Sequence, residues 1–118
     1  LIWSGDATNV PMYYQYLYEG LRFFEVILKV PVWTQGNSTP SASPIYQRIF
    51  FALPDSASYT FATSFIASIP YLQSYNSSTI VEAGLSWSAH GTSSDSAWNI
   101  NLIDSNNRCT IVQVYGHS

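Results

Sequence analysis

The sequence predicts an all-β domain, either an antiparallel β-sandwich or a barrel-like fold of about seven or eight strands. Three observations favour this fold class: apolar and polar residues alternate along several segments, turn-forming residues separate these segments at short intervals, and no segment carries a convincing helical period. The chain has 118 residues, which is the size of one domain. We therefore expect residues 1–118 to form a single β-domain.

The clearest strand pattern lies in the segment from Thr79 to His90. Val81, Leu85 and Trp87 share one face of an extended strand, whereas polar residues such as Glu82 fall on the opposite face. This alternation is typical of a strand with one face on a core and the other in water. A strand of this length needs partners on both edges, which the rest of the chain is expected to supply.

The first part of the chain contains three candidate strands. Residues 1–4 form a short apolar segment, which Gly5 and Asp6 are expected to end as a turn. Residues 12–18 are rich in tyrosine and favour a strand, although two of these tyrosines would also share one face of a helix. Residues 21–30 are apolar on both faces, so we expect this strand to be covered on both sides.

The rest of the chain alternates between loops and strands. Residues 31–44 contain three prolines and are expected to form the longest loop. Further strands are expected at 45–53, 57–68, 97–104 and 108–115, with loops at 70–78 and 91–96. One core is expected to bury Phe61, Phe65, Val81, Leu85, Trp87, Trp98, Ile100 and Leu102.

Charged side chains are scarce in this sequence. They make up 9% of the residues, with four Lys and Arg in total and a net charge of −3. Because Lys and Arg contacts to phosphate dominate nucleic-acid affinity, this composition argues against a nucleic-acid partner. No apolar run reaches the length of a membrane span, so we expect no membrane insertion.

Residues capable of catalysis do not form a recognisable set. Glu82, Ser86, Ser88 and His90 share the polar face of one expected strand. Alternate residues on a strand lie about 7 Å apart, too far for a direct hydrogen bond, which favours a solvated strand face over a nucleophile and its base. The single cysteine, Cys109, is expected to be buried and unreactive. No Cys and His cluster has metal-ligand spacing, so we predict no enzyme activity, no metal and no cofactor.

Aromatic residues are the one class in excess, with nine Tyr, six Phe and four Trp. Several lie in expected loops among Asn, Gln, Ser and Thr, a composition typical of sugar-binding and protein-recognition surfaces. We predict a receptor-binding surface on these loops, made by Trp33, Gln35, Asn37, Tyr71, Tyr75, Asn76, His90 and Asp95. With few charges, its binding should change little with salt. Alternatively, Trp33 closes one end of the barrel and its loop only connects strands.

The two ends of the chain resemble a known family. The first five residues, LIWSG, are similar to the LWSG-type start of C-terminal tip domains in the tail fibres and receptor-binding proteins of tailed bacteriophages. Residues 109–116, CTIVQVYG, resemble the final strand of those domains, which often end in an I-x-x-I-Y-G pattern near the C-terminus. With the strands between, the resemblance spans the chain, although residues 12–18 and 31–44 match no pattern of the family.

This resemblance implies a homotrimeric fibre tip on the virion, extracellular and without catalysis. The tip would attach to the host cell through a bacterial surface polysaccharide or an outer-membrane protein, and the chain would be the C-terminal fragment of a longer fibre protein. Binding loops vary within such families, so no receptor-contacting residue is carried over to this sequence. A free-standing, lectin-like carbohydrate-binding domain is the alternative, and a small polysaccharide hydrolase is the third interpretation.

Overall fold

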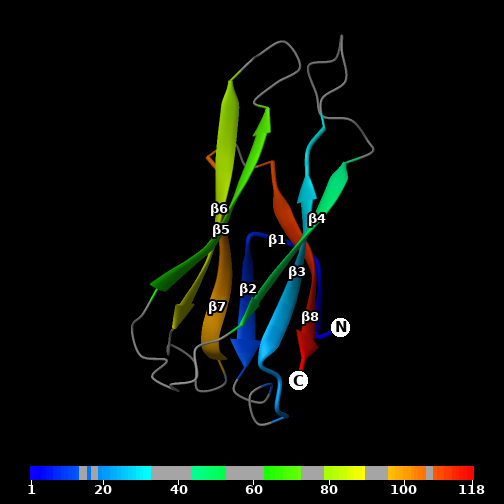
Figure 1. Cartoon of the computed structure of the whole chain (residues 1–118), viewed down its shortest axis with the longest axis vertical. Helices are drawn as coiled ribbons and strands as arrows, with labels where there is room; N and C mark the ends of the chain where they lie inside the picture. Colours follow the sequence, from blue (N-terminus) through cyan, green and yellow to red (C-terminus); the bar gives the residue numbers. More distant parts are fainter. Residues whose placement is uncertain are drawn as a thin grey trace.

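The computed structural model describes residues 1–13, 16, 19–32, 44–52, 63–72, 79–89, 96–105 and 108–118. Within these residues the chain forms eight β-strands: Trp3–Ala7 (β1), Asn9–Tyr13 (β2), Phe23–Val30 (β3), Ile45–Ala52 (β4), Thr63–Leu72 (β5), Ile80–Ala89 (β6), Ser96–Ile103 (β7) and Thr110–His117 (β8). Every paired strand is antiparallel to its neighbour, so the predicted all-β antiparallel fold is confirmed (Figure 1).

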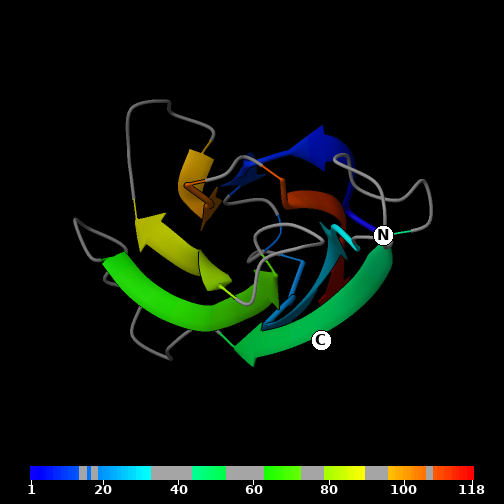
Figure 2. The same cartoon turned by 90° about the horizontal axis from the view of Figure 1, so that it is seen from above.

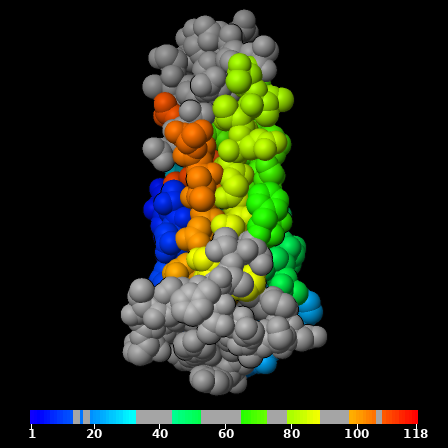
Figure 3. Space-filling model, turned by 90° about the vertical axis from the view of Figure 1, so that its left-hand side faces the viewer, coloured from blue at the N-terminus to red at the C-terminus, as the bar shows by residue number. Residues whose placement is uncertain are grey.

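The strands form two four-stranded sheets. The first sheet has the order β1-β8-β3-β4 and the second has the order β2-β7-β6-β5. Viewed from above, the two sheets curve around a common interior (Figure 2). Figure 3 shows the outer face of the second sheet, where β2, β7, β6 and β5 lie side by side. The fold is therefore a β-sandwich.

The chain passes from the first sheet to the second at Thr8, between β1 and β2. The carbonyl of Thr8 accepts a hydrogen bond from the backbone N–H of Leu102 at 2.8 Å, which ties this crossing to β7. The turn predicted at Gly5 and Asp6 is wrong, because both residues lie within β1. The register of β1 with β8 shifts between Ser4 and Ala7, where β1 has one residue more than β8. A bulge of this kind accommodates the extra residue and does not end the strand.

Two prolines lie inside strands of the second sheet. Pro11 is in β2 and Pro70 is in β5, and these two strands form the edges of that sheet. An edge strand has one side without a partner, so a residue that lacks an N–H group is tolerated there. For this reason β5 continues to Leu72, and the loop predicted at 70–78 is wrong for its first three residues.

Inward-facing side chains of both sheets form one core. Trp98 of β7 is fully buried, and its ring centroid lies 5.1 Å from that of Phe24 in β3, in an edge-to-face arrangement. This aromatic pair joins the two sheets across the interior. The predicted burial of Leu85, Trp87, Trp98, Ile100 and Leu102 in one core is confirmed, and Val81 is partly buried against it.

Phe65 does not belong to this core, so that part of the prediction is wrong. Its side chain is 70% exposed. The register of β5 with β6 shifts between Phe65 and Ala67, so one extra residue interrupts the alternation. Phe65 therefore pairs with Ser86 on the outer face, whereas Ala67 pairs with Leu85 on the core face. Phe61 lies outside the described residues.

The central strand β3 is covered on both faces, as its sequence predicts. Phe24, Val26 and Leu28 face the core and are fully buried. On the opposite face, Glu25 and Ile27 are each only 7% exposed. Because β3 lies between β8 and β4, side chains of these two neighbours shield the outer face of β3 from water.

Candidate binding groove

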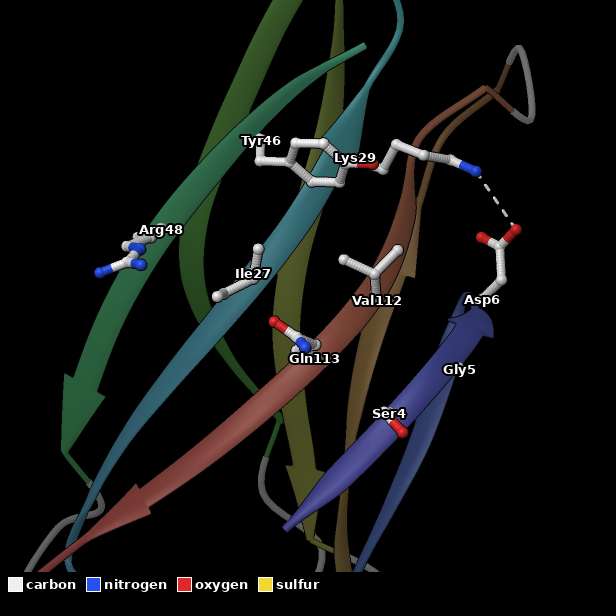
Figure 4. Close-up of a pocket in the computed structure, with 9 residues that line it drawn as sticks. All are labelled: Ser4, Gly5, Asp6, Ile27, Lys29, Tyr46, Arg48, Val112 and Gln113. Carbon is white, nitrogen blue, oxygen red and sulfur yellow. Dashed lines mark hydrogen bonds and ion pairs between the residues drawn. The ribbon is translucent and has the colours of Figure 1, made fainter. Parts of the chain in front are cut away.

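An open groove lies across the outer face of the first sheet, on the side that faces away from the core (Figure 4). We call it the outer groove, and its volume is about 660 Å³. The residues that line it come from all four strands of the sheet: Ser4, Gly5 and Asp6 of β1, Ile27 and Lys29 of β3, Tyr46 and Arg48 of β4, and Val112 and Gln113 of β8. Sheet pairing therefore assembles the groove from both ends and the middle of the chain.

The strand register aligns one residue from each strand in a row across the groove. Arg48 pairs with Ile27, Ile27 pairs with Gln113, and Gln113 pairs with Ser4. Neighbouring strands are about 4.8 Å apart, so three intervals give the row a length of about 14 Å. In this row the apolar side chain of Ile27 lies between the guanidinium group of Arg48 on one side and the amide of Gln113 on the other. The hydroxyl of Ser4 follows beyond Gln113.

A second row contains an ion pair. Lys29 pairs with Tyr46 on one side and with Thr110 on the other. The Lys29 Nζ lies 3.3 Å from Oδ2 of Asp6, the interaction drawn in Figure 4. The neighbouring Thr110 hydroxyl and the Lys29 ammonium group hold the pKa of Asp6 below its ordinary value. Asp6 is therefore ionised at neutral pH and marks the acidic end of this row.

A β-bulge in β8 shapes the floor of the groove. The register between β3 and β8 shifts between Ile27 and Leu28, which makes Val112 an extra residue in β8. Ile111 before it is buried in the core, whereas Val112 and Gln113 both line the outer groove. A bulge redirects side chains in this way. Together, Val112 and Ile27 give the groove an apolar floor.

The edge strand β4 contributes two well-exposed groove residues. Tyr46 is 58% exposed, and the Arg48 side chain is 69% exposed. The Nη1 atom of Arg48 lies 3.8 Å from Oε2 of Glu25, whose side chain is only 10% exposed. This separation is longer than an ordinary hydrogen bond, so the guanidinium keeps donors that a ligand can reach. Lys29 and Arg48 are two of the four Lys and Arg residues in the chain, so the groove concentrates its scarce cations.

The groove can bind a polar ligand that also has an apolar face. It combines an apolar floor, an exposed aromatic ring, and charged, amide and hydroxyl groups around them. Such a combination gives contact area and hydrogen-bond specificity together. Among the described residues, no group of three or more His, Cys, Asp or Glu side chains could hold a metal ion.

Tyr71 does not lie on a receptor-binding loop, which corrects the sequence prediction. It belongs to β5, pairs with Val81 on the core face, and is 7% exposed. Its hydroxyl donates a hydrogen bond to Oδ1 of Asp104 at 2.5 Å. Pro70 suggests a loop at this position, but on an edge strand it leaves the strand intact, and alternation then turns Tyr71 inward.

The other predicted receptor-binding residues lie outside the described residues. They are Trp33, Gln35, Asn37, Tyr75, Asn76, His90 and Asp95. Their contribution to a receptor-binding surface stays a prediction, and so does the weak salt dependence expected of that surface.

The sequence carries a partial signal for the outer groove, which the loop prediction missed. Tyr46 and Arg48 are alternate residues of β4, and Ile27 and Lys29 share the second face of β3. Alternation identifies these side chains as outward-facing. It does not reveal that β8 pairs between β1 and β3, and only this pairing brings Gln113 beside Ile27.

Cys109 and Ser88, which were considered as reactive residues, have contacts that fit a structural role. Cys109 is 1% exposed, which confirms its predicted burial. Burial raises the pKa of its thiol to about 12, and the nearby Asp104 carboxylate acts in the same direction. Ser88 accepts a hydrogen bond at Oγ from Nδ2 of Asn101 at 2.9 Å, as part of the polar outer face of the second sheet.

The chain matches no known protein family, no curated protein and no solved structure. Within the described ranges, no helix is long and apolar enough to cross a membrane. The chemistry of the outer groove is therefore the main structural indication of function.

Proposed function

We propose that the chain is a non-enzymatic receptor-binding domain at the tip of a phage tail fibre, and that it recognises a saccharide on a bacterial surface. The observation that carries this proposal is the outer groove, with its apolar floor beside an exposed tyrosine and several hydrogen-bonding groups. The resemblance of both chain ends to fibre-tip domains supports the context. Those ends are β1 and β8, which pair with each other and contribute five of the groove residues.

A saccharide suits this groove because its rings have apolar C–H faces and polar edges. The ring of Tyr46, which is 58% exposed, offers apolar surface to such a face, and the partly buried side chain of Val112 adds to it. Gln113 and Ser4 can exchange hydrogen bonds with sugar hydroxyls at the far end of the row, and Asp6 can accept them. The row of about 14 Å is long enough for a short oligosaccharide rather than a single sugar.

Binding without hydrolysis is the better-supported activity. A glycosidase needs a carboxylic acid that stays protonated, with a raised pKa, beside a second carboxylate. The pKa of Asp6 is lowered, which is the opposite of what a proton donor requires. Asp6 therefore fits a hydrogen-bond acceptor for sugar hydroxyls, and the hydrolase interpretation loses a candidate acid in the groove.

The assembly expected from the resemblance is a homotrimer, and we propose it for this chain as well. Phe23 and Phe50 are 52% and 64% exposed on the outer face of β3 and β4. Association is the ordinary way to cover apolar surface of this kind. Light scattering should give about 40 kDa, three times the 13.2 kDa of one chain. A monomer mass at micromolar concentration would contradict the trimer and leave the groove proposal unaffected.

The test of the proposed function is binding of the purified domain to an array of bacterial surface polysaccharides, compared with its Tyr46→Ala variant. We expect the wild type to bind a subset of the array and the variant to lose most of that binding, because the stacking surface is gone. Phe65→Ala is the matched control, since Phe65 is also an exposed aromatic residue, at 70% against 58% for Tyr46, and lies on the other sheet. Its binding should equal that of the wild type.

Two outcomes would count against the proposal. Binding that survives Tyr46→Ala unchanged would place the receptor surface elsewhere, with Trp33, in the loop predicted from the sequence, as the next candidate. Binding to outer-membrane protein but to no polysaccharide would favour a protein receptor. A free-standing lectin-like domain would give the same array result as a fibre tip, and a fibrous, repetitive region upstream in the parent protein distinguishes the fibre tip from it.

A further inference from the structure

We propose that the outer groove selects acidic saccharides, and that Arg48 is the residue that binds their carboxylate or sulfate group. This inference rests on the proposed function and adds the ligand class to it. It depends on the difference between the two cations in the groove, on the position of Arg48 relative to Tyr46, and on the scarcity of cations elsewhere.

The two groove cations are not equivalent. Lys29 already has an anionic partner, because its Nζ lies 3.3 Å from the exposed carboxylate of Asp6. Arg48 has its partner Glu25 at 3.8 Å, beyond an ordinary hydrogen bond, and its side chain is 69% exposed against 35% for Lys29. A planar guanidinium can also form two parallel hydrogen bonds with one carboxylate. Arg48 is therefore the cation that can accept an anionic ligand group without first losing a partner.

Glu25 is the anionic neighbour of Arg48. Its side chain is 10% exposed and lies on the same face of the sheet, beside the guanidinium. A buried carboxylate at this separation attracts the guanidinium but does not occupy its donors. Glu25 therefore attracts the guanidinium from the β3 side and leaves its donors accessible to a ligand.

The spacing of Tyr46 and Arg48 suits a sugar acid. They are alternate residues of β4, on the same face, and so lie about 7 Å apart along the strand. A sugar ring stacked on Tyr46 can then direct an acidic group, on itself or on the next unit of the chain, towards Arg48. On the other side of Arg48, Ile27 continues the apolar floor under the ligand.

The local charge of Arg48, and not the charge of the whole domain, favours this ligand class over a neutral one. The chain has a net charge of −3, so an anionic polymer gains nothing from the domain as a whole and must be recognised by a local cation. A neutral saccharide would leave the Arg48 guanidinium with Glu25, at 3.8 Å, as its anionic neighbour and would add no charge-assisted hydrogen bond. Binding of an acidic saccharide at Arg48 should also weaken as salt is added. The receptor surface predicted on the loops has few charges, and its binding is expected to change little with salt.

The experiment uses acidic capsular and lipopolysaccharide-derived polysaccharides and their carboxyl-reduced forms, in which each uronic acid is converted to its neutral sugar. We expect wild-type affinity to fall about tenfold or more on carboxyl reduction, as for the loss of one bidentate charged contact. Arg48→Gln should bind the acidic and reduced forms equally, and Arg48→Lys should recover part of the difference. Sulfated polysaccharides and their desulfated forms provide the second arm for a sulfate ligand.

Arg108→Gln is the matched control, because it removes the same charge from an exposed position outside the groove. It should keep the wild-type preference for the acidic form. If the domain binds saccharides but prefers neutral forms, or if Arg48→Gln keeps the acidic preference, the inference fails while the proposed function stands. If no saccharide binds at all, both fail together.

Discussion

At the scale of single residues, Asp104 is a buried carboxylate that connects three strands. It is 7% exposed and accepts hydrogen bonds from the Tyr71 hydroxyl at 2.5 Å and from the backbone N–H groups of Arg108 and Cys109, both at 2.9 Å. These contacts tie β5 to the connection between β7 and β8. One carboxylate therefore satisfies several buried donors at the place where three strands meet.

We predict that Asp104→Ala lowers the free energy of unfolding by about 3 kcal/mol or more, because it removes the carboxylate that accepts from the Tyr71 hydroxyl and from two backbone N–H groups. Tyr71→Phe removes only one of these hydrogen bonds and should cost about 1 kcal/mol. Urea unfolding followed by tryptophan fluorescence measures both variants. Equal costs for the two substitutions would show that Asp104 does not have this central role.

Cys109 provides a pH-dependent prediction. Its thiol pKa rises from an ordinary 9.0 to about 12 in the folded chain, first because of burial and then because of Asp104. Above pH 9 the unfolded chain releases this proton and the folded chain keeps it, so stability is present below pH 9 and falls as the pH rises towards 12. The slope from this one group is at most about 1.4 kcal/mol per pH unit.

The measurement is the free energy of unfolding of the wild type and of Cys109→Ala between about pH 8 and pH 10.5, a window set by the linkage relation. Cys109→Ala loses packing at every pH but has no thiol to titrate. The stability difference between the two proteins should therefore shrink as the pH rises. Two parallel profiles would contradict the raised thiol pKa.

At the scale of the strands, packing within β1 explains why a glycine follows Trp3 two residues later. A Cβ atom at Gly5 would lie 2.9 Å from Cζ2 of Trp3, so the indole ring covers the space where a side chain would begin. Trp3 packs against the core from this edge of the first sheet. Gly116 in β8 is similar, because a Cβ atom there would lie 2.6 Å from Cδ1 of Leu21. Both glycines belong to the terminal motifs, which therefore have a packing reason in this fold.

We predict that Gly5→Ala destabilises the domain by about 1 to 3 kcal/mol, because the new methyl group displaces Trp3 from the core. Gly84→Ala in β6 is the matched control, since nothing lies within 4 Å of a Cβ atom at that position. Its effect should stay within about 0.5 kcal/mol. Thermal unfolding of the two variants decides the matter, and a Gly5→Ala variant as stable as Gly84→Ala would contradict the packing argument.

At the scale of the whole molecule, local pattern predicted the faces of strands better than their neighbours. The alternation of apolar and polar residues along β6 correctly predicted the burial of Leu85 and Trp87. A strand in the middle of a sheet keeps the two-residue alternation of its side chains. Phe65 and Tyr71 were predicted wrongly because a bulge and an edge proline in β5 are tertiary features, which the sequence alone does not mark.

The outer groove could be predicted only in fragments. Tyr46 and Arg48 are recognisable as outward-facing residues of one strand, and Ile27 and Lys29 as those of another. These residues lie near Asp6 and Gln113 only because of the strand order β1-β8-β3-β4. This order places β1 and β8, the first and last strands of the chain, in the same sheet as β3 and β4. Pairing between segments so distant in the sequence is decided by the packing of the complete sandwich, and no local pattern records it.

The central claim is that the ligand lies in the outer groove, and a saccharide titration followed by backbone amide NMR tests it most directly. The titrant is the bacterial polysaccharide fragment that binds best on the array. We predict that the largest shift changes fall on the row Ser4, Gln113, Ile27 and Arg48 and on its neighbour Tyr46. Shift changes confined to residues 31–44, with none in this row, would contradict the groove and favour the receptor surface predicted from the sequence around Trp33.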